Sequence, residues 1–75
     1  MIVRAEMPGR VTAVAVHQGD TVVAGQELLV LESMKMEIPV LSPTAGCVEV
    51  LEVVPGQLVA VGQSLLSVEE TGQLS

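Results

Sequence analysis

The sequence predicts an all-β domain: a flattened eight-strand barrel or sandwich in which two four-stranded antiparallel sheets face each other about a pseudo-two-fold axis. Three observations predict this fold class. The chain of 75 residues repeats itself at an offset of 37 positions. Its short apolar runs are separated by glycine and proline, as strands and turns are. No segment shows the 3.6-residue periodicity of a helix, so we expect essentially no helix.

The internal repeat covers most of the chain. Laid on itself without gaps, the sequence is identical at ten of the 24 positions from Gly9 to Glu32. Three of these positions are glycines that we place at turns, where a positive φ is expected. Two copies are too few for a solenoid, so residues 1–75 are predicted to form one domain, with residues 71–75 as a flexible tail. The identical pairs are Gly9/Gly46, Val11/Val48, Val16/Val53, Gly19/Gly56, Val22/Val59, Gly25/Gly62, Gln26/Gln63, Leu28/Leu65, Leu29/Leu66 and Glu32/Glu69.

Eight strands follow from this repeat in chain order. Each copy begins with a long strand rich in valine, breaks at a glycine, continues as a short strand, turns at a second glycine and ends in a long strand. One further strand precedes each copy. The predicted strands are Ile2–Ala5, Gly9–Val16, Thr21–Val22, Glu27–Ser33, Met36–Leu41, Gly46–Val53, Leu58–Val59 and Ser64–Glu70.

The long strand that opens each copy contains a break in its alternation. Glu49 and Glu52 bracket the apolar pair Val50 and Leu51, so the order of inward and outward side chains slips. The first copy has the apolar pair Ala13–Val14 at the same offset. A β-bulge or sharp coil at both places restores a consistent interior, and it bends the sheets strongly enough to form two facing layers.

Composition limits the class of function. The chain has a net charge of −6, no aromatic residue and a single cysteine, Cys47. It therefore lacks the clustered cations and aromatic rings that nucleic acids and anionic membranes require. Its four-residue apolar runs fall far short of the ~20 residues that span a bilayer, and residues 1–6 do not resemble a signal peptide. We expect a cytoplasmic protein that binds neither nucleic acid nor membrane and is monomeric in isolation.

Lys35 is the only lysine, and it lies in the segment between the two copies. The repeat places its equivalent at Gly72, so Lys35 is expected at one end of the molecule and the chain termini at the other. It should stand at the tip of a tight hairpin that joins Glu27–Ser33 to Met36–Leu41. An exposed and unique amine on a rigid turn suits covalent modification, because acylation converts its ammonium into a neutral amide.

The run Met34-Lys35-Met36 resembles the biotin-attachment motif of the biotinyl/lipoyl attachment domain family, and the resemblance extends from about Ile2 to Glu70. Biotinyl domains are carrier modules of biotin-dependent carboxylases and have a flattened, hammerhead-like barrel. The resemblance implies that biotin protein ligase attaches biotin to Lys35. It also implies that the biotin arm moves a carboxyl group from a biotin carboxylase to a carboxyltransferase, while the carrier itself has no catalytic or metal site.

The residues beside the lysine are expected to select its partners. Met34 and Met36 alternate about it on a strand-like backbone, where they either form an apolar recognition surface or pack onto the end of the barrel. They favour biotin, because lipoyl domains typically have Asp-Lys-Ala or Asp-Lys-Val at this place. Ser33 stands where the commonest biotinyl pattern has alanine, as in some small free-standing biotin/lipoyl attachment proteins. Recognition by the ligase is assigned to Glu32, Ser33 and Glu37.

The sequence leaves two other functions open. The first is a lipoyl carrier of a 2-oxo-acid dehydrogenase or glycine-cleavage-type system, or a domain that accepts both biotin and lipoate. The second is an unmodified barrel that acts only in protein interactions, as lipoyl-like domains do in some membrane-efflux adaptors. Such a module needs no lysine at the hairpin tip, which disfavours it. The sequence offers no nucleophile–base pair and no cluster of metal ligands, so we do not expect an enzyme.

Overall fold

The fold is built from strands. The computed structural model describes residues 1–70, and within them it contains eight strands and no helix. None of the described segments is a helix long and apolar enough to cross a membrane. The predicted tail, residues 71–75, lies outside the described residues. The strands are β1 (Ile2–Arg4), β2 (Gly9–Val14), β3 (Thr21–Val22), β4 (Glu27–Ser33), β5 (Met36–Leu41), β6 (Gly46–Leu51), β7 (Leu58–Val59) and β8 (Ser64–Glu70).

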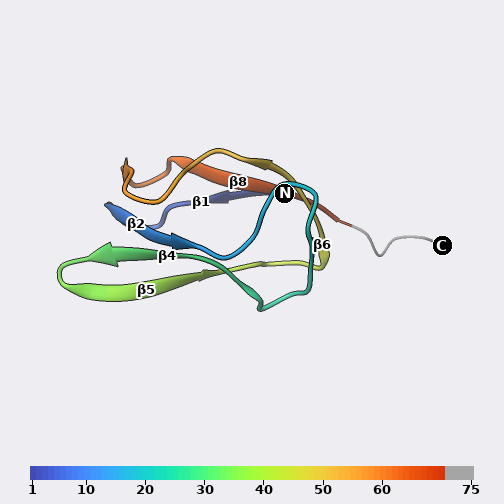
Figure 1. Ribbon diagram of the computed structural model, residues 1–75, viewed down its shortest axis with the longest axis horizontal. Coiled ribbons are helices and arrows are strands. Elements are labelled where there is room, and N and C mark those ends of the chain that lie inside the picture. Colours follow the sequence, from blue (N-terminus) through green and yellow to red (C-terminus); the bar gives the residue numbers. More distant parts are fainter. Residues whose placement is uncertain (71–75) are drawn as a thin grey trace.

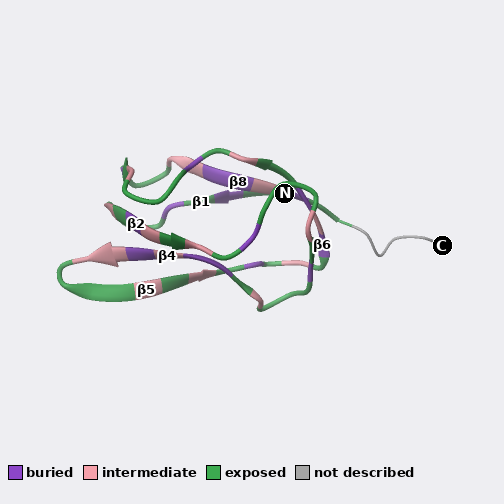
Figure 2. Ribbon diagram, viewed as in Figure 1, coloured by how far each residue is buried: buried purple, intermediate pink, exposed green. Residues whose placement is uncertain are grey.

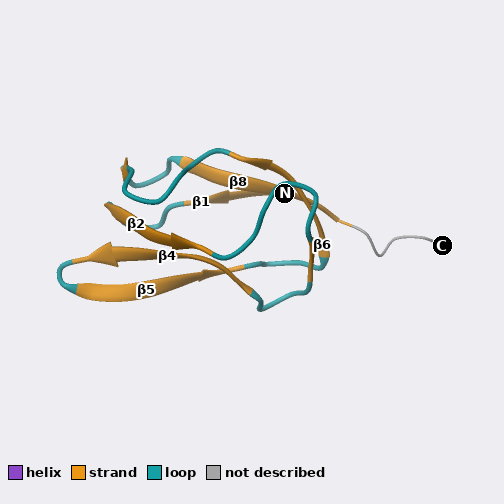
Figure 3. Cartoon of the chain, viewed as in Figure 1, coloured by secondary structure: helices purple, strands orange, loops and turns teal. Residues whose placement is uncertain are grey.

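The strands form the two four-stranded antiparallel sheets that the sequence predicts (Figures 1 and 3). The strand order is β1-β8-β6-β3 in one sheet and β5-β4-β2-β7 in the other. The repeat relates β1 to β5, β2 to β6, β3 to β7 and β4 to β8, which converts one order into the other. Each sheet therefore takes two strands from each half of the chain, and the topology has the predicted pseudo-two-fold symmetry.

The turns between strands repeat this symmetry in their hydrogen bonds. Gly19 and Gly56 have φ of 95° and 94°, a conformation that favours glycine. The N–H of Gly19 donates to the carbonyl of Val48 at 2.8 Å, and the N–H of Gly56 donates to the carbonyl of Val11 at 2.7 Å. The predicted equivalence of these two turns is confirmed.

The second pair of turns explains the repeated Gly-Gln dipeptide. Gly25 and Gly62 have φ of 87° and 85°. The side-chain oxygens of Gln26 and Gln63 each accept a hydrogen bond at 3.0 Å from the backbone N–H three residues earlier. Each glutamine thus closes its own turn, so the same two residues are needed in both copies.

Gly9 and Gly46 are the first residues of β2 and β6, as the predicted strand bounds have them, but they lack the turn conformation expected of these glycines. Neither has a positive φ. Space requires glycine here, because a Cβ on Gly9 would lie 2.7 Å from the carbonyl oxygen of Glu32, and a Cβ on Gly46 would clash with the carbonyl oxygen of Glu69. The turn prediction is wrong for this pair, since close backbone approach selects the same residue type as a left-handed turn.

Bulges interrupt β2 and β6 at equivalent places, as the break in alternation predicts. The register shifts between Val11 and Ala13 in β2 and between Val48 and Val50 in β6. Both strands end two residues sooner than predicted, and β1 ends one residue sooner. Their apolar continuations reflect the packing of connecting segments on the core. The buried residues just beyond these strand ends are Ala5, Val16 and Val53.

The core between the sheets is aliphatic and symmetric. The buried stretches of the chain are drawn in purple in Figure 2. Ala5 and Ser42 are equivalent and are both 3% exposed. The buried hydroxyl of Ser42 is satisfied, because it donates to the carbonyl of Thr44 at 2.7 Å. The remaining buried pairs place matching side chains at the centre of both halves. These pairs are Val11/Val48, Val16/Val53, Val22/Val59, Leu28/Leu65, Leu29/Leu66 and Leu31/Val68.

The hairpin formed by β4 and β5 lies at one end of the molecule, at the left of Figure 1, and Met1 lies towards the other end. The predicted separation of the lysine turn from the N-terminus is confirmed. Because β5 is the edge strand of its sheet, β2 is the only strand within residues 1–70 that pairs with the hairpin from outside it. The contacts between β2 and β4 therefore decide how firmly the hairpin is held.

Candidate functional site

Lys35 lies in a two-residue turn. β4 ends at Ser33 and β5 begins at Met36, and these two residues are directly paired. Met34 and Lys35 have φ of 54° and 65°, and two successive left-handed residues are the geometry of a type I′ hairpin turn. The predicted tight hairpin is confirmed. The strand-like backbone expected at Met34 is wrong, because this residue forms half of the turn.

The turn is strained, and its sequence does not relieve the strain. Type I′ turns prefer pairs such as Asn-Gly, because a left-handed conformation costs other L-residues about 1–2 kcal/mol each. Among residues 1–70, Met34 and Lys35 are the non-glycine residues with positive φ. Both therefore occupy the turn against local preference. Departures of this kind concentrate at functional sites.

The tip of the hairpin is open to solvent. Met34 is 91% exposed and Met36 is 60% exposed. Neither methionine packs onto the end of the barrel, which was one of the two expectations for them. Lys35 is exposed too, and within the described residues its amine takes part in no hydrogen bond or ion pair. The turn thus presents a primary amine to solvent on a short and defined backbone.

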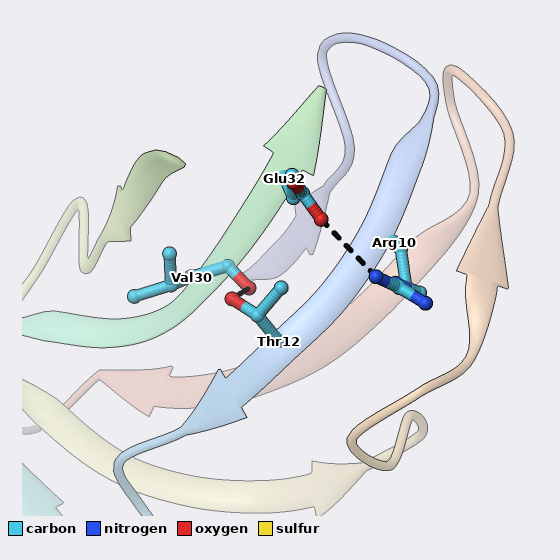
Figure 4. Close-up of polar contacts among 4 residues, drawn as sticks. All are labelled: Arg10, Thr12, Val30 and Glu32. Carbon is cyan, nitrogen blue, oxygen red and sulfur yellow. Dashed lines mark hydrogen bonds and ion pairs between the residues drawn. The ribbon is translucent and has the colours of Figure 1, made fainter. Parts of the chain in front are cut away.

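A row of charged side chains crosses the sheet just behind the tip. Glu37 of β5 lies directly opposite Glu32 of β4, which lies directly opposite Arg10 of β2. Directly paired residues share one face of a sheet, and like charges in such pairs are destabilising. A guanidinium nitrogen of Arg10 donates to Oε1 of Glu32 at 3.2 Å (Figure 4). Arg10 therefore offsets the repulsion between the two carboxylates.

Two hydroxyl groups fasten β4 to its neighbours. Thr12, at the bulge of β2, donates to the carbonyl of Val30 at 3.3 Å (Figure 4). Ser33, the last residue of β4, donates to the carbonyl of Pro8 at 2.8 Å. Pro8 lies in the connection between β1 and β2. β4 is thus held from its middle to the last residue before the turn.

The predicted site residues, at positions 32 to 37, all lie on this hairpin, but Pro8 and Arg10 were missed. Both contact the base of the hairpin although they are distant from it in sequence. One signal was available, because the repeat has Ala45 and Cys47 at the equivalent positions while the glycine between them is unchanged. Positions at which the two copies of the repeat differ indicate residues with a role at one end of the barrel and not at the other.

The chemistry that this end offers is that of an amine. Within residues 1–70 no group of three or more His, Cys, Asp or Glu residues is arranged to hold a metal ion. His17 and Asp20 are a histidine and a carboxylate in proximity, but their contacts belong to a turn. The backbone N–H of His17 donates to Oδ2 of Asp20 at 2.8 Å, and the imidazole Nδ1 of His17 lies 3.7 Å from the same oxygen. Both contacts join residues three apart and close a loop.

A two-sheet β-barrel that presents one amine on an exposed hairpin has the architecture of a cofactor-attachment domain. The family model described as "Biotin-requiring enzyme" matches residues 1–69, and the chain belongs to this biotin/lipoyl family.

Relatives of this chain occur as small proteins and within large enzymes. It is 38% identical over 73 residues to the biotin/lipoyl attachment protein of Bacillus subtilis. This match covers 97% of this chain and 100% of that protein. It is 42% identical over 64 residues to the biotin carboxyl carrier protein of Streptococcus mutans, of which it spans 49%. It is 42% identical over 66 residues to the pyruvate carboxylase of Staphylococcus aureus, and the match spans 6% of that protein.

The fold is also found in solved structures. A single-chain, multi-domain long-chain acyl-CoA carboxylase contains a region that matches 96% of this chain with a TM-score of 0.89 and 38% identity. The match covers 7% of that enzyme. The predicted family and fold class are thus both confirmed.

Proposed function

We propose that this chain is a biotin carboxyl carrier in which Lys35 holds biotin through an amide bond. The proposal rests on one observation: a strained, exposed turn presents the only lysine of the chain between Met34 and Met36. These residues fit the group, because acylation of an exposed amine disturbs no packing and breaks no contact of the described residues. When bound there, biotin supplies the group that accepts and releases the carboxyl group.

The contribution of the chain itself is presentation. Nζ of Lys35, as the neutral amine, attacks the carbonyl carbon of the adenylate that biotin protein ligase makes from biotin and ATP. The C–N bond forms as the bond from that carbon to the phosphate oxygen breaks and AMP leaves. The nitrogen gives up a proton, so the ammonium of the free lysine is replaced by a neutral amide. The turn keeps the attachment point at the end of a rigid barrel. We assign the exposed Met34 and Met36 to contacts with the ligase and the carboxylase. Glu32 and Glu37 form the acidic surface behind them.

The names of the relatives support the proposed partners. They include a biotin carboxyl carrier protein and carboxylases. We propose that the chain serves a biotin carboxylase and a carboxyltransferase as a non-catalytic subunit, in the cytoplasm.

The test is labelling followed by intact mass. Incubation with biotin, ATP and biotin protein ligase should add one biotinyl group to the wild-type chain. Lys35→Arg keeps charge and exposure but cannot form the amide, so it should remain unlabelled while its circular dichroism is unchanged. Labelling of the arginine variant at another position would overturn the assignment, and so would a wild-type chain that stays unlabelled.

Lipoate is the second candidate, because the Bacillus subtilis relative is named for both groups. Competition between a biotin ligase and a lipoate ligase, read by intact mass, decides between them. We expect biotin to dominate on the wild-type chain. The double variant Met34→Asp/Met36→Ala should shift the ratio towards lipoate. An unchanged ratio would place the selectivity elsewhere, in Glu32, Glu37 or the shape of the turn.

A further inference from the structure

The segment from Pro8 to Arg10 holds the base of the lysine hairpin through three contacts. The hydroxyl of Ser33 donates to the carbonyl of Pro8 at 2.8 Å. Arg10 pairs with Glu32 at 3.2 Å. Between them, Gly9 lets the backbones meet, since a Cβ at this position would lie 2.7 Å from the carbonyl oxygen of Glu32. These contacts, which we call the tip clamp, act on the last two residues before the turn.

The opposite end of the barrel is an internal control, because the same fold is built there from different residues. Gly46 makes the same close approach to the carbonyl of Glu69, so the glycine contact belongs to the fold. The two side-chain contacts are not repeated with the same partners, since at the opposite end it is Thr44 that donates to the carboxylate of Glu70. A cysteine cannot pair with a carboxylate as a cation does, and a carboxylate cannot donate to a carbonyl. The residues equivalent to Pro8, Arg10 and Ser33 are Ala45, Cys47 and Glu70.

We infer that the tip clamp positions the lysine hairpin for acyl transfer, with Ser33 and Arg10 as positioning residues. The inference rests on the proposed function. The hairpin needs such support, because its turn is strained and a strand of the same sheet supports it from one side only. Transfer requires Nζ of Lys35 to meet the activated carbonyl in a narrow range of distance and angle. Ser33 and Arg10 therefore act through the fold of the hairpin and not through contact with the ligase.

The first test uses the unmodified protein and needs no ligase. NMR hydrogen exchange at the amide of Met36, which pairs with Ser33 across the turn, reports opening of the turn. Ser33→Ala removes one hydrogen bond and should speed this exchange about fivefold. Ser33→Thr keeps the hydroxyl and should restore the wild-type rate. Arg10→Gln should speed exchange about twofold, because an exposed ion pair contributes little.

A matched control lies at the opposite end. The hydroxyl of Thr44 donates to a carboxylate oxygen of Glu70 at 3.2 Å, and Thr44→Val removes this contact at nearly constant shape. It should leave exchange at Met36 unchanged. The stability of Ser33→Ala in urea should fall by no more than about the same fivefold factor, because the lost hydrogen bond is absent from the unfolded chain as well. A larger fall would indicate damage to the core.

The second test separates positioning from binding. With the unmodified chain as the varied substrate of biotin protein ligase, Ser33→Ala should lower kcat about threefold to fivefold and change KM less than twofold. Ser33→Thr should recover kcat. A change confined to KM would mean that Ser33 contacts the ligase directly, and it would overturn the inference.

The exchange data can overturn it independently. Unchanged exchange at the tip in both Ser33→Ala and Arg10→Gln would show that the clamp holds nothing. Equal acceleration at the turns of Gly19 and Gly56 would show global loosening instead, as would an effect of Thr44→Val on the tip. A wild-type chain that is not labelled refutes the proposed function. The exchange results need no labelling, so they test separately whether the tip clamp holds the hairpin.

Discussion

Replacing Met34 with glycine should stabilise the fold and impair the site at the same time. Met34 has a φ of 54°, which glycine adopts freely and methionine does not. The side chain is 91% exposed, so its removal forfeits almost no burial. The change therefore acts almost entirely on the backbone of the turn.

The magnitude follows from two opposing terms. Relief of a left-handed conformation returns about 1–2 kcal/mol. The extra backbone entropy of glycine in the unfolded chain opposes folding by about 0.5–1 kcal/mol. The free energy of unfolding should thus rise by about 0.5–1 kcal/mol, which corresponds to an increase in Tm of about 4 °C for a domain of this size.

Urea and thermal unfolding followed by far-UV circular dichroism measure this change. The matched control is Met36→Gly, since Met36 is also exposed but lies in β5 with a negative φ. That variant should lose about 1 kcal/mol, because glycine is unfavourable in a strand. If Met34→Gly proved less stable than the wild type, the strain assigned to the turn would be refuted. Ligase labelling of Met34→Gly should be slower, because the thioether surface is lost.

Three more results are expected. Gly46→Ala should lower the free energy of unfolding in urea by about 3 kcal/mol or more, because its Cβ would meet backbone and the Val68 side chain. Gly9→Ala should lower it by about 1–2 kcal/mol. Equal losses would contradict the argument from space. Leu28→Ala and Leu65→Ala, both fully buried equivalents, should each cost about 2–5 kcal/mol and agree within about 1 kcal/mol; a wider gap would show that the two halves of the core differ. Dilute peroxide should oxidise Met34 first among the methionines and slow labelling, as seen by peptide mass spectrometry; undiminished labelling of the sulfoxide would remove Met34 from the recognition surface.

Strand positions were predictable wherever the repeat and the glycines agree. The bounds of β3, β4, β5, β7 and β8 are those expected, because each of these strands begins just after a turn. The errors lie where apolar residues continue past the end of hydrogen bonding. Val16 and Val53 are 2% exposed but belong to connections that pack on the core. An apolar residue indicates burial, and it indicates a strand only when the alternation also holds.

The site was predictable in its lysine and not in its local structure. Uniqueness and the repeat place Lys35 at a hairpin tip, but no local preference indicates two left-handed residues in Met-Lys. The bonds from Pro8 and Arg10 depend on the register between β2 and β4, and the bulge in β2 changes that register. Sequence patterns predict such a bulge to within a residue or two, which is too coarse to pair side chains across strands.

The pairing of β8 with β1 repeats the pairing of β4 with β5, yet no turn joins β8 to β1. Two separate copies of one repeat would assemble as an isologous dimer with two identical ends. When the two copies are joined in one chain, the connection forms the lysine turn at one end of the barrel. At the other end β1 and β8 pair without such a connection. The molecule thereby has a polarity that its near-symmetric core lacks. A docking partner meets one lysine hairpin per molecule and never has to choose between two.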